Sequence, residues 1–99
     1  MSDVDESDPV SIPIEDALDL HPFLPGETAD VVSAYVRLAA EKGFREVRLI
    51  HGRGIGVQRQ IVRSALKKSP SVLSIADADS ARGGWGATVA VLRTPEDAK

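Results

Sequence analysis

The strongest constraint on the fold is the order in which two hydrophobic patterns follow each other along the chain. Short apolar runs, typical of strands, alternate with two longer segments whose apolar residues recur at helical spacing. The runs occupy residues 17–21, 46–51, 72–76 and 87–92, and the helical segments occupy residues 27–42 and 57–68. This order, β-α-β-α-β-β, predicts an α/β fold in which right-handed helical crossovers join parallel strands.

The same order predicts the directions of the strands. The first three strands should share one direction, because each helix carries the chain back to the start of the sheet. The last strand follows a hairpin-like loop, residues 77–86, and should therefore run antiparallel to them. It is apolar on both faces, which predicts an interior position in a mixed sheet of four strands.

Three polar or glycine-rich clusters mark the places where these strands meet loops. They are Leu18-Asp19-Leu20-His21, His51-Gly52-Arg53-Gly54, and Gly83-Gly84-Trp85-Gly86 before Ala87-Thr88-Val89. Ligands of open α/β sheets bind outside the carboxyl ends of the parallel strands. We therefore expect all three clusters at one edge of the sheet, sharing a single site.

The glycine-rich loop after the second strand has the physical features of a phosphate cradle. Gly52, Gly54 and Gly56 let the backbone approach closely, and the helix that follows presents unpaired N–H groups to an anion. The spacing matches neither a P-loop nor a dinucleotide-binding fingerprint. A tight turn without a ligand is the alternative, and the presence of His51 and Arg53 favours phosphate.

Asp19 and His21 lie on one face of the first strand and can hydrogen-bond the same ligand. The carboxylate could orient the imidazole or act as a base, and His51 is a second candidate for proton transfer. The alternative is a structural pair that anchors a loop. These three residues could also bind a metal, but the pattern does not establish the ligand geometry, so we predict no structural metal site.

Three further features bear on a polyanion as the ligand. Arg59, Arg63 and Lys67 form a basic stripe on the second helix, which could follow a phosphate backbone or simply face solvent. Trp85 could stack on a base or pack over the sheet edge. Residues 1–36 contain nine acids and no Lys or Arg, whereas residues 37–99 contain twelve Lys and Arg against six acids.

Composition predicts the class and the compartment. The chain of 99 residues has no cysteine, no apolar run of membrane-spanning length and an acidic start, so we expect one cytoplasmic domain. We predict a disordered acidic arm at residues 1–9, a single domain at residues 10–93 and a tail at residues 94–99.

Taken together, the clusters resemble the motifs of the Smr (small MutS-related) domain. The L-D-x-H motif of that family falls on Leu18, Asp19 and His21, its H-G-x-G motif on His51, Gly52 and Gly54, and its G-G-x-G-A-T element on Gly83, Gly84, Gly86, Ala87 and Thr88. The resemblance covers roughly residues 14–93 and the chain is similar to the free-standing bacterial members. It implies a two-layer α/β sandwich similar to the C-terminal domain of translation initiation factor three.

The resemblance also implies binding of DNA or RNA, nicking or endonuclease activity in several members, and a place in DNA repair or recombination. Two hypotheses follow. In the first, Asp19 and His21 catalyse phosphodiester cleavage while Arg53 and the amides of residues 52–56 hold the phosphate. In the second, the chain is a non-catalytic binding or adaptor module. We expect a monomer without membrane contact, and a need for a divalent metal such as magnesium stays open.

Overall fold

The computed structural model describes residues 14–52, 56–82 and 84–93, without the side chains of Arg82 and Trp85. Its elements are β1 (Ala17–Asp19), α1 (Pro25–Glu41), β2 (Glu46–Ile50), α2 (Val57–Lys68), β3 (Val72–Asp77) and β4 (Ala87–Leu92), with two 3₁₀ turns at Ser80–Arg82 and Gly84–Gly86. Within this part of the chain, no helix is long and apolar enough to cross a bilayer. The predicted arm, residues 1–9, and the tail, residues 94–99, lie outside the described residues.

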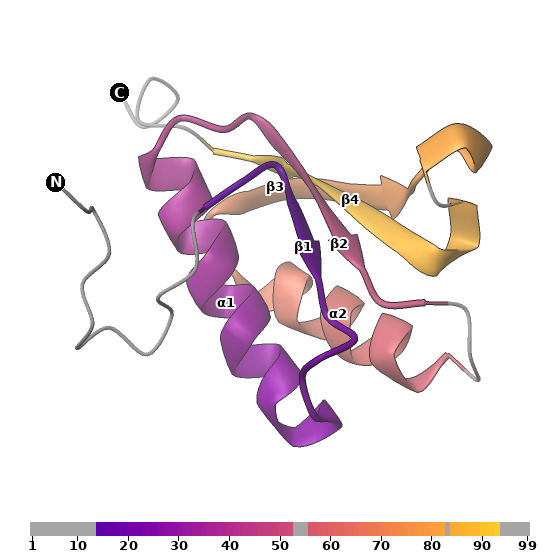
Figure 1. The fold of residues 1–99 in the computed structure, drawn as a ribbon. Coiled ribbons are helices and arrows are strands. Elements are labelled where there is room, and N and C mark those ends of the chain that lie inside the picture. Colours follow the sequence, from indigo (N-terminus) through magenta and orange to yellow (C-terminus); the bar gives the residue numbers. More distant parts are fainter. Residues whose placement is uncertain (1–13, 53–55, 83, 94–99) are drawn as a thin grey trace, which may run out of the picture.

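The four strands form one mixed sheet in the order β1-β2-β4-β3. β1 pairs in parallel with β2, and β4 runs antiparallel between β2 and β3. The first three strands therefore share a direction, and the apolar strand β4 is interior. Both expectations, and the α/β class with a four-stranded mixed sheet, are confirmed (Figure 1).

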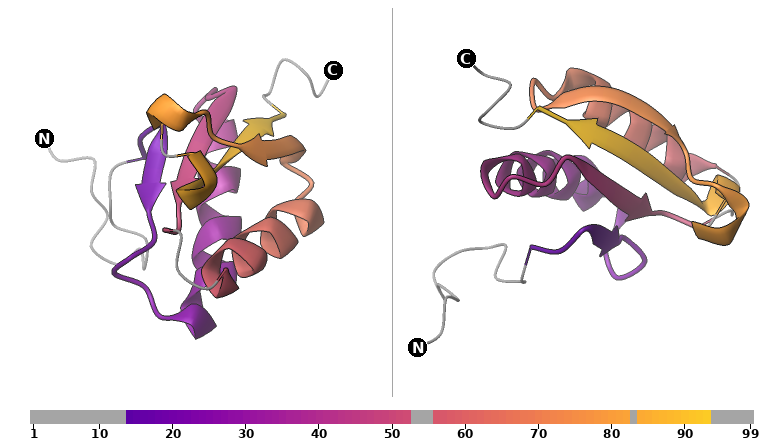
Figure 2. Two further views of the ribbon diagram at one scale, coloured as in Figure 1. Left: turned by 90° about the vertical axis from the view of Figure 1, so that its right-hand side faces the viewer. Right: turned by 90° about the horizontal axis from the view of Figure 1, so that it is seen from above.

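Both helices cover one face of the sheet, which makes two layers (Figure 2). The core between the layers is formed by side chains such as Leu18, Leu49, Val36 and Leu66, all less than a tenth exposed. In its first turn, helix α1 buries Thr28, whereas the neighbouring Ala29 is exposed. Thr28 is accommodated because its hydroxyl lies 3.1 Å from Leu24 O and 2.9 Å from the Gln58 side chain.

The boundaries of α1 follow from its terminal residues. The helix begins at Pro25, two residues before the predicted start, because proline at the first helical position has the required φ and needs no N–H partner. Glu27 accepts a hydrogen bond from Leu24 N–H at 2.9 Å. At the other end Gly43, with φ +92°, closes a Schellman motif in which Phe44 N–H donates to Ala39 O at 3.0 Å.

The first two strands are shorter than predicted, and hydrogen bonds explain both differences. β1 ends at Asp19 rather than at residue 21, because the Asp19 carboxylate captures His21 N–H at 2.9 Å. β2 ends at Ile50, because the N–H groups of His51 and Gly52 both turn to Gly86 O. Polar residues of the candidate site thus end both strands.

Candidate functional site

Asp19 and His21 form an exposed pair just after β1. Asp19 Oδ1 accepts hydrogen bonds from His21 N–H at 2.9 Å and from His21 Nδ1 at 2.6 Å, and both side chains are about 60% exposed, at 59% and 63%. The backbone hydrogen bond, followed by the contact with the imidazole, lowers the pKa of the Asp19 carboxyl. An ionised Asp19 holds the proton of His21 on Nδ1, which leaves Nε2 as the basic nitrogen.

Gly52 lies against the imidazole of His21 and joins the first two motifs. Its φ is +80°, and a Cβ atom at this position would lie 3.0 Å from His21 Nε2. Only glycine combines this left-handed backbone with such a close approach. The glycine-rich pattern predicts phosphate binding by Gly52, and the structure packs this residue against His21.

The carbonyl oxygen of Gly86 joins the second cluster to the third. It accepts hydrogen bonds from His51 N–H at 3.1 Å and from Gly52 N–H at 2.9 Å. The predicted meeting of the three clusters at one sheet edge is therefore observed. The Gly52 amide already donates a hydrogen bond within the protein, and its predicted contact with a phosphate stays a prediction.

His51 is buried, and both of its ring nitrogens are engaged. Nδ1 lies 2.8 Å from Gly52 O, a pure acceptor, so Nδ1 carries the proton and Thr88 Oγ1 donates to Nε2 at 2.9 Å. Burial, assisted by the charges of Arg59 and Arg63, lowers the pKa of the imidazole and keeps it neutral. Its role in proton transfer stays a prediction, and the engagement of both ring nitrogens favours a positioning role.

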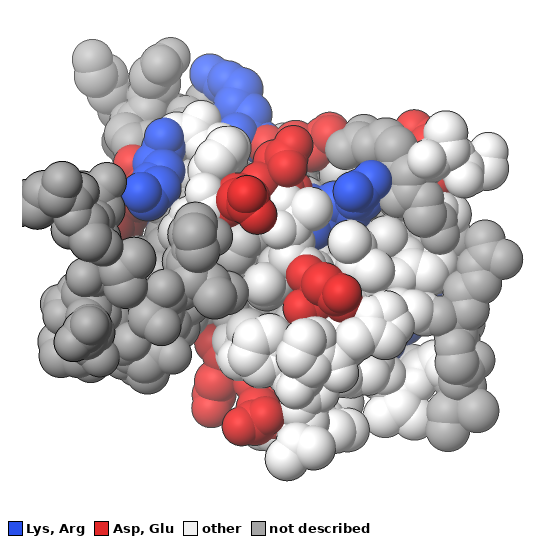
Figure 3. Space-filling view, viewed as in Figure 1, with Lys and Arg blue, Asp and Glu red and all other residues white. Residues whose placement is uncertain are grey.

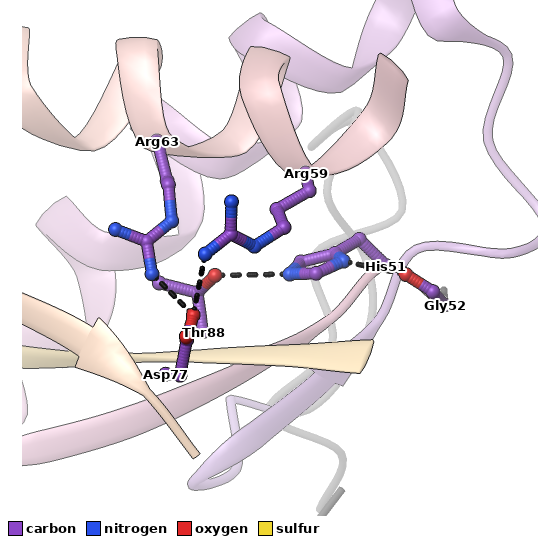
Figure 4. Close-up of polar contacts among 6 residues, drawn as sticks. All are labelled: His51, Gly52, Arg59, Arg63, Asp77 and Thr88. Atoms are coloured by element: carbon purple, nitrogen blue, oxygen red, sulfur yellow. Dashed lines mark hydrogen bonds and ion pairs between the residues drawn. The ribbon is translucent and has the colours of Figure 1, made fainter. Parts of the chain in front are cut away.

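The basic stripe on α2 is divided by its contacts, and Figure 4 shows two of its members, Arg59 and Arg63. Arg59 and Arg63 reach toward the sheet, and their Nη2 atoms lie 2.7 and 2.5 Å from Asp77 Oδ1 at the end of β3. The hydrogen bond from Arg59, and then that from Arg63, lowers the pKa of the Asp77 carboxyl. Lys67 is exposed on the last turn. Two of the three predicted phosphate ligands thus already bind an anion of the chain itself.

Sequence reasoning missed Asp77 and Thr88 as members of this group. Both had a readable signal. Asp77 is an acid at the carboxyl end of a predicted strand, opposite two arginines four residues apart on a helix. Thr88 belongs to the G-G-x-G-A-T element, and it is a polar residue in the otherwise apolar strand β4.

The polar residues form two groups on opposite faces of the sheet. Asp19 alternates with the buried residues Leu18 and Leu20, so its side chain is on the open face. His51, by contrast, bonds Thr88, which shares the helix-covered face of β4 with Ala90 and Leu92. The predicted single site is therefore divided into two groups. One is the exposed group of Asp19, His21 and Gly52, and the other is a more enclosed group beneath α2. The backbone of Gly52 and Gly86 connects the two groups.

Several predicted site residues are not placed by these contacts. Arg53, Gly54 and Gly83 lie outside the described residues, as does the side chain of Trp85. Gly56 has φ +86° and precedes α2, and Gly84 has φ +53° in the second 3₁₀ turn. Their predicted phosphate contacts, and the stacking of Trp85, stay predictions.

The charge on the visible surface is mixed rather than basic. On the face seen in Figure 3, acidic groups are spread among separate basic ones, and the described residues form no continuous basic patch there. Among these residues no group of three or more His, Asp and Glu side chains is placed to hold a metal ion. Asp19 is the carboxylate that the exposed group could offer to magnesium.

Comparison with known proteins identifies the family of the chain. The model of the Smr domain matches residues 18–93, which include all three clusters. The chain belongs to the Smr domain family. The expected family is thereby confirmed.

The relatives of this Smr domain include much larger proteins. The chain is 39% identical to "Endonuclease MutS2" of Caldicellulosiruptor saccharolyticus and 38% identical to that of Thermus thermophilus, over 80% and 77% of its own length. It spans only 10% of each of these proteins.

Two solved structures share the fold. The Smr domain of Thermus thermophilus MutS2 has a TM-score of 0.74 and 37% identity, over 80% of this chain and 99% of that one. YdaL of Escherichia coli, described as a stand-alone small MutS-related protein, has a TM-score of 0.69 and 30% identity, over 83% and 67%.

Proposed function

We propose that this Smr domain binds nucleic acid and cleaves its phosphodiester bonds, with Asp19 and His21 as the reacting pair. The observation that carries the proposal is the exposed imidazole whose Nδ1 is held at 2.6 Å by a carboxylate. No described residue hydrogen-bonds the other ring nitrogen. Curated relatives named as endonucleases support the choice of reaction.

The pair has the features of a general base. Asp19 fixes the tautomer and stabilises the imidazolium that forms when Nε2 takes a proton. Nε2 would accept that proton from the attacking oxygen, a water molecule or the 2′-hydroxyl of RNA. The oxygen then bonds to phosphorus, the bond from phosphorus to the leaving oxygen breaks, and that oxygen is reprotonated. Gly52, without a side chain, leaves the backbone close to this nitrogen.

Magnesium would need further ligands to bind at this edge. Asp19 Oδ1 already accepts two hydrogen bonds, and Mg²⁺ prefers several oxygen ligands in octahedral geometry. The described residues offer one carboxylate here, so we derive no step through a metal. The need for magnesium is decided in the same assay as the activity.

Cleavage of supercoiled plasmid and of structured RNA, each with magnesium or with EDTA, tests the proposal. We expect Asp19→Asn and His21→Ala to lower the rate by about 10²-fold or more, the usual contribution of a general base. Asp16→Asn is the matched control, since it removes another exposed acid near β1. Wild-type protein that cuts neither substrate, or variants that cut as fast as the control, would contradict the nuclease proposal.

One observation favours a second function, a non-catalytic binding or adaptor module for DNA or RNA. Asp19 also captures His21 N–H and so ends β1, which is a structural role for the same pair. In this case wild type binds an oligonucleotide without cutting it. His21→Ala then retains the affinity, whereas Asp19→Ala lowers the stability.

A further inference from the structure

Arg59 and Arg63 converge on a single oxygen atom. They are four residues apart on α2, so both guanidinium groups lie on the same side of the helix. Their Nη2 atoms approach Asp77 Oδ1 from two directions at 2.7 and 2.5 Å (Figure 4). Two guanidinium groups aimed at one oxygen form a receptor for an oxyanion.

The arginine pair carries two positive charges, and both guanidinium groups face the single carboxylate of Asp77. Arg63 Nε is buried and has no hydrogen-bond partner among the described residues. A phosphate diester has two acceptor oxygens on one atom and can bind a guanidinium group through two parallel hydrogen bonds.

Asp77 is placed where another anion could replace it. Its side chain is 43% exposed, whereas those of Arg59 and Arg63 are 24% and 23% exposed. The carboxylate is therefore the solvent-facing member of the ion pair, and water can solvate it when it leaves the arginines. The ion pair of Asp77 with the arginines also lies beside His51 and Thr88 (Figure 4). The backbone N–H of His51 donates to Gly86 O at the sheet edge that the candidate site occupies.

We infer that Arg59 and Arg63 form a phosphate-binding site that Asp77 occupies as an internal competitor, and that a backbone phosphate of the nucleic acid displaces this carboxylate. The inference deepens the proposed function and rests on it for the identity of the ligand. It assigns Asp77 a regulatory role: the carboxylate weakens the binding of anions in general, and a ligand that is also held elsewhere on the domain displaces it more readily than a free anion does.

The test compares Asp77→Asn with Asp79→Asn, which makes the same charge change two residues further along. We measure the affinity for a fluorescent oligonucleotide at several salt concentrations. Removing the competitor should raise the affinity about two- to fivefold, and Asp79→Asn should change it less. The salt dependence should steepen by about one phosphate contact in Asp77→Asn alone. Equal affinities for the two variants, or weaker binding by Asp77→Asn, would overturn the inference and make Asp77 a positioning residue for the arginines.

A second arm uses inorganic phosphate, followed by NMR signals of the arginine side chains. In Asp77→Asn, phosphate should shift the Arg59 and Arg63 signals at lower concentration than in wild type. If this occurs while no variant binds an oligonucleotide, the proposed function fails and the anion site stands. If phosphate leaves these signals unchanged in both proteins, the anion site fails.

A further pair of variants covers the case in which Asp77→Asn does not fold. Arg63→Gln should then weaken oligonucleotide binding more than Lys67→Gln does, because Lys67 is exposed at the end of α2. Equal losses for the two variants would contradict the site.

Discussion

At the scale of single residues, two side-chain contacts and one carbonyl hold the site together. His21 lies between Asp19 and Gly52, His51 lies between the backbone of Gly52 and Thr88, and Gly86 O binds two successive amides. One histidine is therefore exposed and oriented by a carboxylate, whereas the other is buried and neutral. Two identical side chains acquire different chemistry from their surroundings.

Gly52→Ala should lower both stability and cleavage. The left-handed backbone costs an alanine about 1–2 kcal/mol, and its Cβ would meet His21 Nε2 at 3.0 Å. Gly43→Ala is the control, because Gly43 has φ +92° and nothing within 4 Å of the added carbon. Urea denaturation should show a similar loss of stability for both variants, and only Gly52→Ala should impair cleavage. Full activity in Gly52→Ala would show that the contact is dispensable.

His51 should make the domain less stable in mild acid. Burial lowers the pKa of the folded imidazole, so below the unfolded pKa of about 6.5 the unfolded chain binds more protons than the folded one. The free energy of unfolding therefore falls as the pH decreases from about 6.5 toward the lowered pKa. Arg59 and Arg63 add to the shift, and Gly52 O and Asp77 oppose it.

Urea unfolding at pH 7.5 and at pH 5.5 measures this effect. His51→Asn should lose less stability between the two values than wild type does. An unchanged pH dependence in His51→Asn would show that other groups cause the loss.

At the scale of elements, α2 combines core packing with the ion pairs to Asp77. Val62, Ala65 and Leu66 are buried against the sheet, while Arg59 and Arg63 extend over its end. The sequence predicted α2 and β4 with their observed bounds, because helical periodicity and a run apolar on both faces are local signals. The ends of β1 and β2 depend on hydrogen bonds to side chains and to a distant carbonyl, which no local pattern reveals.

Leu66→Ala should destabilise the domain by about 2–5 kcal/mol, because it leaves a cavity in place of a fully buried side chain of α2. Leu73→Ala is the control, since Leu73 on β3 is 49% exposed and should cost less than about 0.5 kcal/mol. Differential scanning calorimetry or urea titration separates the two variants. A similar loss in both would contradict the assignment of the core.

At the scale of the whole molecule, the sheet separates the two polar groups and the helices cover one of them. A nucleic acid that contacts both the Asp19–His21 pair and the arginine pair has to cross the sheet edge near Gly52 and Gly86. The large apolar side chains exposed in the described residues, Leu24, Val57 and Leu73, come from three different parts of the fold. Nothing in this distribution resembles the apolar surface of a permanent dimer.

We therefore expect a monomer at micromolar concentration, as the sequence also predicts. Sedimentation velocity should give a single species near 10.5 kDa. A species of twice this mass, dissociating on dilution, would contradict the expectation and point to one of the exposed apolar side chains. The variants Leu73→Ser and Val57→Ser would then show which of these side chains lies in the dimer interface.

The sequence by itself determined the order of elements, the direction of the strands and the edge at which the three clusters meet. Periodicity and glycine positions are local properties of the sequence, and strand directions follow from the order of the elements. All of them can therefore be read from the sequence before the chain folds. Only the tertiary structure decided which face each polar side chain occupies and which partner it has. Asp77 binds the arginines of α2, buried His51 contacts Thr88, and His21 remains exposed beside Asp19. The first two contacts join residues that are far apart in the sequence and come together only in the folded domain, and the exposure of His21 likewise depends on the fold around it.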